Sequence, residues 1–401
     1  MLAKQSGVLA RLWAALACVA VLLLSGSAHA YPWMIRHHYT SCSACHYDPS
    51  GAGPISAYGR AVADAVIRMN GTSEGAAELP PSAKFLFGAV PTPAWLELGG
   101  DVRVMSLSSK TAGTPLTNRL IWMQLDAGAS ISVSGFVASG TLGFAPEGAL
   151  GAALTRGTDN NLVSRQHWIG YQLPGSAELM LRVGRMNLPF GIRNVEHTLW
   201  AKQLSRTSID DQQQYGASAY LGVGKLRGEV MGIAGNLQLR PDRYRERGYS
   251  AYLEIEATDG LALGASSLIT YRNLDTVTLE NTFRHAHGAF GRWATPYEPL
   301  VLLTEWDYVF ESSKGSYYKR GLVSYLQADW EPVQGIHVLA TGEANKVGVR
   351  ERAWSYGGWL SYAWYCAPHA DVRLDGIYQS LGSSVGRDGV FTVLLQGHVF
   401  L

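Results

Sequence analysis

After residue 30 the sequence has no long apolar run, which excludes a protein that crosses a membrane with helices of about 20 apolar residues. Charge imbalance is also missing, because 33 basic and 32 acidic residues leave a formal net charge of +1. We therefore expect no nucleic-acid partner. Four cysteines are too few for a disulfide-rich secreted scaffold. The sequence also lacks a phosphate-binding loop, a zinc signature and a nucleophile–base arrangement, so hydrolase or transferase chemistry has no support.

The first thirty residues have the pattern of an export signal. A positively charged start and an apolar run over 12–24 precede Ala28-His29-Ala30, a small-x-small cleavage pattern. The pattern predicts a signal peptide over 1–30 and a mature chain that starts at Tyr31. Cys18 is then removed with the signal.

The rest of the chain is rich in residues that suit a membrane barrel. It contains 45 glycines, 20 tyrosines and 12 tryptophans, with only 16% charged residues. Tight turns such as "LPGS", "ATDG" and "EPVQG" alternate with longer segments such as 146–160 and 190–213. Bacterial outer-membrane barrels have short periplasmic turns, long outer loops and an even number of strands. We therefore predict an all-β fold over 95–401, a transmembrane antiparallel β-barrel of sixteen strands.

The predicted strands lie at 95–107, 119–132, 136–145, 161–173, 177–189, 214–222, 225–234, 248–257, 260–272, 284–295, 299–311, 317–331, 335–346, 351–365, 369–379 and 390–401.

Charged side chains recur with a period of two inside these strands. Glu97, Asp101 and Arg103 share one face of the first strand, and Glu305 and Asp307 share one face of a later strand. Such alternation predicts a polar lumen and an apolar outer wall. A soluble sandwich or propeller is the alternative, and it lacks the regular exchange of short and long connections. Sixteen strands enclose a lumen wide enough for water.

A short motif precedes the barrel. Cys42-Ser43-Ala44-Cys45-His46 matches the C-x-x-C-H pattern of covalent c-type haem attachment. The two cysteines form thioether bonds to one porphyrin, and the adjacent histidine binds its iron. A disulfide, a thioredoxin-like pair and a zinc site are the alternatives. The strand–helix context of thioredoxin and a second cluster of zinc ligands are both missing. The motif therefore predicts one covalent haem c on Cys42, Cys45 and His46.

The second axial ligand of this haem has several candidates. Met34, His37 and His38 precede the motif, and Met69 follows it. Methionine would raise the reduction potential relative to a second histidine. For each of these residues a packing or surface role is the competing interpretation, and an open sixth position is a further alternative.

Residues 31–94 form a short segment of their own. Residues 71–93 are rich in Pro, Gly and Ser and resemble a tether, whereas a helix opened by Pro54 is predicted to end at Asn70-Gly71. The remaining forty or so residues are too few to bury a core unaided. We therefore predict a haem-bearing, partly helical, cytochrome c-like plug in or over the periplasmic mouth of the barrel.

Several of these motifs resemble a known family. "CSACH" (42–46), Pro54 and "AYGR" (57–60) resemble the fused monohaem cytochrome–porins of the outer membrane, best known from bacteria that oxidise ferrous iron. The order of signal peptide, short cytochrome and porin-like barrel is the same. "DPSGAGP" (48–54) departs from the family pattern and indicates an offshoot. Separately, "GRMNLPFGIRN" (184–194) is similar to a segment of anion-selective porins.

The resemblance implies attachment through Cys42 and Cys45, with His46 as the proximal ligand, and transfer of one electron across the outer membrane. Expected partners are outer-membrane lipid and lipopolysaccharide, soluble periplasmic c-type cytochromes and an extracellular redox partner. Ferrous iron is one such donor in the family, which would make the chain an extracellular iron-oxidising cytochrome, although these residues do not name the donor. The alternative function is a solute-conducting porin with a structural or gating haem module.

The fourth long loop is basic. "LRPDRYRER" carries Arg240, Arg243, Arg245 and Arg247. These side chains would attract anionic solutes or contact the phosphates of surface lipopolysaccharide.

Overall fold

The computed structural model describes residues 32–69, 80–81, 84–146, 160–194, 196, 198–209, 212–235, 245–275, 279–313, 318–348, 353–367, 369–383 and 386–400. The predicted signal peptide lies outside these residues. Arg240 and Arg243 of the fourth long loop also lie outside them.

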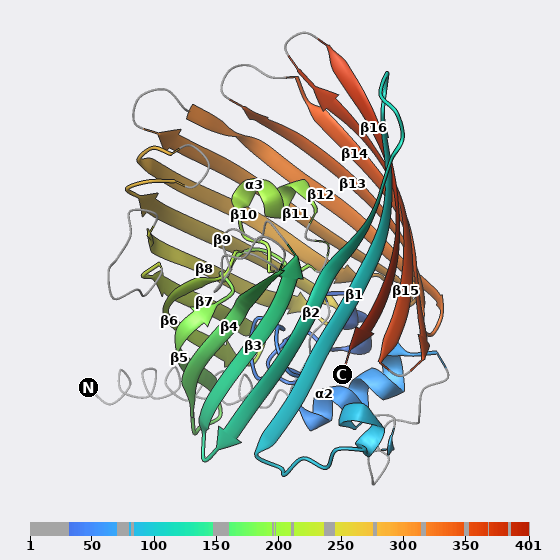
Figure 1. Ribbon diagram of the computed structural model, residues 1–401. Coiled ribbons are helices and arrows are strands. Elements are labelled where there is room, and N and C mark those ends of the chain that lie inside the picture. The colour runs from blue at the N-terminus through green and yellow to red at the C-terminus, as the bar shows by residue number, and fades with distance from the viewer. Residues whose placement is uncertain are drawn as a thin grey trace, which may run out of the picture.

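Sixteen strands close into one antiparallel barrel, in which β1 pairs with β16 (Figure 1). The strands are β1 (Leu96–Thr111), β2 (Thr117–Val133), β3 (Phe136–Pro146), β4 (Asn160–Leu173), β5 (Glu178–Met186), β6 (Gln214–Val223), β7 (Leu226–Ile233), β8 (Glu246–Thr258), β9 (Leu261–Arg272), β10 (Thr282–Ala294), β11 (Leu300–Ser313), β12 (Tyr318–Val333), β13 (Ile336–Gly348), β14 (Ser355–Ala367), β15 (Ala370–Gly382) and β16 (Arg387–Phe400).

The predicted barrel is therefore confirmed strand by strand. The largest differences from the predicted bounds are at the end of β1, residue 111 against 107, and at the start of β14, residue 355 against 351. The period-two pattern was sufficient because each strand has one face toward the lumen and one away from it.

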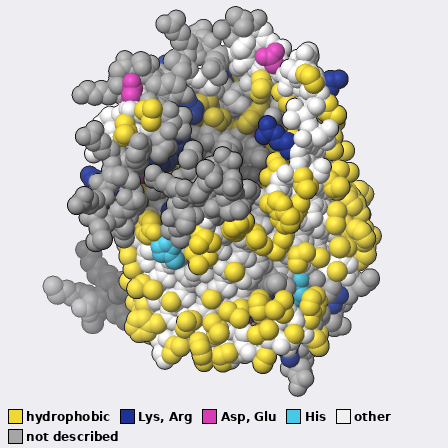
Figure 2. Space-filling model, viewed as in Figure 1, with side chains coloured by type: hydrophobic (Ala, Val, Ile, Leu, Met, Phe, Trp, Pro, Cys, Tyr) yellow, Lys and Arg dark blue, Asp and Glu magenta, His cyan; other side chains and the backbone are white. Residues whose placement is uncertain are grey.

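The two faces of the wall differ as predicted. Leu120 is 70% exposed, Leu360 63% and Trp306 60%, and apolar side chains cover much of the outer surface in Figure 2. Next to Trp306 in sequence, Glu305 and Asp307 point inward and are fully buried. An apolar outer band around a polar interior is the arrangement of barrels that stand in lipid.

Short and long connections lie at opposite ends of the barrel. The chain turns at 134–135 between β2 and β3, and at 334–335 between β12 and β13, whereas 187–213 separates β5 from β6. In consecutive antiparallel strands such connections alternate between the two ends. We call the end with the tight turns the short-turn mouth.

Short helices precede the barrel in the described part of the chain: the 3₁₀-helix η1 (Pro32–His37), the α-helix α2 (Ala57–Val62) and the π-helix η2 (Ala63–Ile67). The predicted helix start at Pro54 was wrong. Ser56 is the N-cap, because its side chain accepts a hydrogen bond from the Gly59 N–H at 3.1 Å. A further 3₁₀ turn, η4 (Phe85–Gly88), lies between this segment and β1.

In the part of the chain that the structure describes, no helix has the length and apolar character needed to cross a membrane.

Residues 32–69, which we call the N-terminal segment, lie at the short-turn mouth (Figure 1). The Gln334 side chain in the β12–β13 turn donates to the carbonyls of Ala65 and Arg68 at 2.7 and 2.9 Å. The Met69 N–H donates to the Tyr365 carbonyl on β14 at 3.1 Å. The segment is therefore attached to the ends of several strands.

The long connection between β5 and β6 folds into the barrel. It carries the helix α3 (Trp200–Ser205), which contacts β11, β12 and β13 and is drawn inside the barrel outline in Figure 1. This helix was not predicted, because six residues are too few for a clear helical period.

Candidate functional site

The Cys42–His46 stretch forms a single helical turn. The Cys42 carbonyl accepts hydrogen bonds from the N–H groups of Cys45 at 3.2 Å and His46 at 3.0 Å. Residues three and four apart on a helical turn share one side. The turn therefore brings the first cysteine close to both the second cysteine and the histidine.

The turn is joined directly to the start of α2. His46 forms an isolated antiparallel bridge with Ile55, and the Ser56 N–H donates to the Cys45 carbonyl at 2.7 Å. Gly59 packs against the same backbone, because a Cβ there would lie 2.5 Å from the Cys45 carbonyl oxygen. Only glycine allows this approach, which explains the glycine of "AYGR".

Neither Cys42 nor Cys45 is in a disulfide, and Cys45 is buried. Burial raises the pKa of Cys42. Burial and the neighbouring Cys42 raise the pKa of Cys45 to about 12. A thioredoxin-like pair needs a cysteine with a lowered pKa, so this environment disfavours that alternative.

His46 has one nitrogen engaged by backbone and one nitrogen free. The ring hydrogen-bonds the Gly53 backbone, and burial lowers the pKa of His46, which favours the neutral imidazole. Nδ1 is buried and has no hydrogen-bond partner among the residues that the structure describes. A half-turn of the ring would exchange the two nitrogens. Histidine ligands of metals commonly have this arrangement, with a carbonyl fixing one nitrogen and the other available.

The loop after His46 is fixed to the barrel wall. Asp48 accepts from the Ser50 N–H at 2.7 Å and from Arg182 on β5 at 2.6 Å, and both charged side chains are fully buried. Burial opposes ionisation, but Arg182 and Ser50 hold the pKa of Asp48 below its ordinary value. Asn187 donates to the Ser50 hydroxyl at 3.0 Å. "DPSGAGP" is therefore the loop that contacts β5 and the start of the inward connection.

Other polar contacts hold the N-terminal segment from several sides of the barrel. Arg36 pairs with Glu331 on β12, and Arg60 pairs with Glu97 on β1. The remaining contacts run from Thr40 to Arg292 on β10 at 2.8 Å, from Ser41 to Tyr220 on β6 at 2.9 Å, and from Ser43 to Glu178 on β5 at 2.8 Å.

The four candidates for a second axial ligand are dispersed. Met34 is buried in the core beside Ile35, and His38 is exposed in a left-handed conformation with φ 62°. Burial and the Arg36 charge lower the pKa of His37 to about 4. Met69 lies beside β14, where its N–H donates to the Tyr365 carbonyl. None of the four lines the cavity that His46 lines.

Three neighbouring cavities extend from Cys42 into the lumen. The Cys42 cavity has a volume of about 40 Å³, and it shares Pro32 and Arg193 with the His46 cavity of about 180 Å³. The His46 cavity in turn shares Arg103 with a cavity of about 570 Å³, which we call the wall cavity. The attachment turn therefore lies at one end of a row of neighbouring spaces.

His398 lines both the His46 cavity and the wall cavity. Its Nδ1 lies 2.8 Å from Asp371 and its Nε2 lies 3.1 Å from Asp101. Both ring nitrogens are therefore engaged by the wall. Sequence reasoning placed Asp101 in the lumen correctly, but it did not identify His398 as its partner on the far end of the chain.

Ion pairs hold the inward connection against the opposite wall. Lys202 of α3 lies 2.7 Å from Glu305, and the Ile192 N–H donates to the same carboxylate at 2.8 Å. Gly191 has φ +59°, and a Cβ there would lie 2.2 Å from a Glu305 oxygen. Glu305 therefore anchors this connection, whereas the sequence pattern had placed it only on the polar lumen face.

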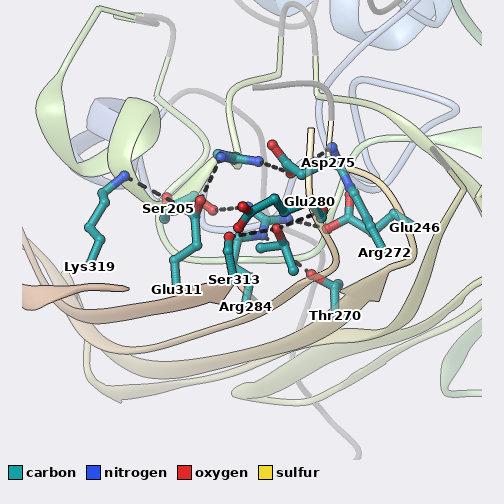
Figure 3. A network of polar contacts seen from close by, with 12 residues as sticks. Ser205, Glu246, Thr270, Arg272, Asp275, Glu280, Arg284, Glu311, Ser313 and Lys319 are labelled. Atoms are coloured by element: carbon teal, nitrogen blue, oxygen red, sulfur yellow. Dashed lines mark hydrogen bonds and ion pairs between the residues drawn. The ribbon is translucent and has the colours of Figure 1, made fainter. Parts of the chain in front are cut away.

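The end of α3 enters a larger polar network, shown in Figure 3. Arg206 lies 2.7 Å from Asp275 and 3.0 Å from Glu311, and Arg284 donates to the Ser205 carbonyl at 2.7 Å. The same network includes Glu246, Arg272 and Lys319. It fixes the helix across the lumen.

Sequence reasoning missed the residues that position the site. Arg182, Asp48 and Gly59 were not among the predicted site residues. A charged residue in the middle of the predicted strand 177–189 was the available signal for Arg182, because such a residue must point into the lumen or find a partner. For Gly59 the signal was a glycine inside a predicted helix.

Comparison with solved structures identifies the fold. No protein-family model and no curated protein matches the sequence. The barrel is similar to OmpT of Vibrio cholerae, with a TM-score of 0.57 at 9% identity over 78% of this chain and 100% of that chain. It is equally similar to an anion-selective porin from Comamonas acidovorans, with a TM-score of 0.57 at 11% identity over 76% and 99%. The outer membrane channel DcaP of Acinetobacter baumannii follows at 0.54 and 10% identity over 78% and 99%. The chain thus has the fold of outer-membrane porins.

Proposed function

We propose that this chain is an outer-membrane barrel that carries one covalent haem c and passes electrons between an extracellular partner and periplasmic carriers. One observation carries the proposal: the Cys42–His46 turn lies at the mouth of a closed barrel and is held there by the wall. The apolar outer band, the porin fold and the export signal support the outer membrane as its location.

The residues on this turn fit the proposed group. Two neighbouring thiols outside any disulfide, together with a histidine whose Nδ1 has no partner among the described residues, are the donor set that attachment needs. The row of cavities that begins at Cys42 is consistent with a large planar group beside the turn. When bound, the haem supplies reversible one-electron exchange at its iron.

The protein residues would hold and position that group. Cys42 and Cys45 would form the thioether bonds, and His46 would be the proximal ligand. The Gly53 backbone would orient the histidine ring, and Gly59 would keep α2 packed on the attachment turn. The dispersed positions of the four distal candidates support no choice among them, so the proposal assigns the proximal side only.

The apolar wall of the barrel is the physical reason for proposing that a haem carries electrons across it. The apolar band of such a barrel is about 25 Å tall and insulates the two sides from each other. A redox centre inside the wall divides this span. The short-turn mouth would face the periplasm and its soluble c-type cytochromes, and Arg245 and Arg247 of the opposite loop would face lipopolysaccharide.

The test begins with the purified mature chain, expressed together with a haem-attachment system. We expect a mass increased by one haem and the absorption spectrum of a c-type cytochrome. In liposomes with a trapped oxidised dye, an external reductant that cannot cross the membrane itself should reduce the haem and then the dye. His46→Ala should abolish dye reduction. A colourless chain of unmodified mass, or full transfer by His46→Ala, would refute the proposal.

A solute-conducting porin is the second candidate function. The similarity to solved channels favours it, because these neighbours include an anion-selective porin and an outer membrane channel. Here the N-terminal segment would be a structural or gating module. The same liposomes separate the two functions: solute leakage without dye reduction supports the porin, and dye reduction without leakage supports the conduit.

A further inference from the structure

The wall cavity is unusual for the lumen of a porin-like barrel. It lies between α3 and the inward faces of β1, β2 and β14–β16, and it measures about 570 Å³. Its apolar lining includes Met105, Met123, Trp200, Trp359, Ile377 and Leu394. The interior of such barrels is ordinarily polar, so a cluster of inward apolar and aromatic side chains needs a reason.

Size and lining match a small-molecule site. Ligand cavities in proteins commonly measure about 300–1,000 Å³ and combine an apolar lining with a few polar groups. Trp200 and Trp359 offer flat faces on which aromatic rings can pack. Met105 and Met123 add sulfur atoms, which make favourable contacts with aromatic rings. A planar aromatic molecule is therefore the shape and surface that this space would accept.

The acidic side chains around the cavity are all engaged by side chains of the barrel. Arg373 lies 2.5 Å from Glu196 and 2.8 Å from Asp375, and Asp371 is paired with His398. Each acidic group of the lining therefore has a partner, with Arg373 shared between Glu196 and Asp375 and His398 shared between Asp371 and Asp101. A cationic ligand would have to compete with those existing ion pairs.

Arg103 is different. It lines both the wall cavity and the His46 cavity, and it is only partly exposed. Within the described ranges it makes no hydrogen bond and no ion pair. A guanidinium in a half-buried lumen position has five donors to satisfy, and a carboxylate matches its planar fork with two hydrogen bonds.

We propose that the wall cavity binds a diffusible planar aromatic acid, with its rings between Trp200 and Trp359 and its carboxylate on Arg103. The same carboxylate chemistry has a second source, because a propionate of the proposed haem would also suit Arg103. The experiment below separates the two. The inference does not depend on the haem, since none of the attachment residues lines this cavity.

The test is equilibrium dialysis of the full mature chain in detergent against anthraquinone-2-carboxylate. We expect saturable binding at one site, and at least tenfold weaker binding of the neutral anthraquinone-2-carboxamide. Arg103→Gln should weaken binding of the acid at least tenfold and leave the amide within twofold. Arg387→Gln, at the exposed end of β16, is the matched control and should change neither. Heat-dependent migration in gels reports that each barrel is folded.

A second variant tests the apolar side. Leu394→Gln keeps Arg103 but places an amide on the apolar wall, so it should weaken the acid and the amide alike. Absence of saturable binding, or equal affinity of the acid for wild type and Arg103→Gln, would overturn the inference. A shift of the haem reduction potential in Arg103→Gln without probe binding would assign the arginine to the haem instead, and also overturns it. If the chain takes up no haem but still binds the acid through Arg103, the missing haem refutes the proposed electron transfer and this inference stands.

Discussion

Asp48 and Arg182 form a fully buried ion pair, 2.6 Å long, between positions 134 residues apart. It joins the loop after the attachment turn to the inner wall at β5. Arg182 also pairs with Glu229 on β7 at 2.5 Å. The N-terminal segment therefore docks on charges that the wall itself holds in place.

Asp48→Asn should loosen this docking without unfolding the barrel. The amide cannot supply the negative charge, while Arg182 keeps Glu229, so we expect a loss of about 2 kcal/mol. That loss raises the undocked fraction of the segment roughly 30-fold. Limited proteolysis of residues 32–69 in the purified protein measures it.

Lys225→Gln is the control for that experiment. Lys225 pairs with Asp259 at 2.8 Å in an exposed turn, where ion pairs contribute little. We expect the same proteolysis rate as in wild type. A segment that is equally protected in Asp48→Asn and wild type would show that the buried pair does not hold it.

Gly59→Val should lower the yield of haem attachment. A Cβ at this position would lie 2.3 Å from the Ile55 side chain and 2.5 Å from the Cys45 carbonyl oxygen. Overpacking of this kind costs about 1–3 kcal/mol, and here it pushes α2 away from the attachment turn. The ratio of haem absorbance to protein mass measures the yield.

Ala57→Val tests whether any larger residue in α2 has the same effect. Ala57 is exposed on the same helix, so this variant should retain full haem content. If Gly59→Val also retains it, the packing of α2 on Cys45 has no part in positioning the motif.

Substitution of any one candidate for the second axial ligand should leave the haem spectrum unchanged. None of Met34, His37, His38 and Met69 lines the cavity of His46. Single changes of methionine to leucine or histidine to glutamine should therefore leave the absorption spectrum and reduction potential of the haem-loaded protein unaltered. A large drop in potential in one methionine variant would identify that residue as the ligand, because methionine ligation raises the potential. Cys42→Ser, which removes one thioether, is the positive control for a changed spectrum.

The wall was predictable from the sequence because each of its rules is local. Alternating side chains set the strand faces, and turn spacing set the ends, so residues such as Glu97 and Asp307 were placed correctly without knowledge of their partners. The partners themselves were not predictable. Asp101 meets His398 only because β1 closes on β16, and Asp48 meets Arg182 only after the N-terminal segment enters the barrel.

The site was predictable only where its residues are close together in the sequence. C-x-x-C-H fixes three residues within one turn, so Cys42, Cys45 and His46 could be proposed from the chain alone. The wall cavity is assembled from β1, β2, β14–β16 and α3. Inward apolar residues such as Ile377 and Leu394 become visible as a group only when the strand register is known.

Lys202→Met should widen the lumen. Lys202 is the cation that holds α3 against Glu305, and both side chains are buried. Its loss leaves a buried carboxylate without its cation, at a cost of about 3 kcal/mol, and releases the inward connection from β11. Conductance of single barrels in planar bilayers should rise, whereas Lys225→Met, in the exposed turn, should conduct like wild type. The haem spectrum should stay unchanged, because the Lys202 side chain pairs with Glu305 on β11 and not with the attachment turn. Unaltered conductance would mean that the network around Arg206 suffices to hold the helix, since its ion pairs to Asp275 and Glu311 remain.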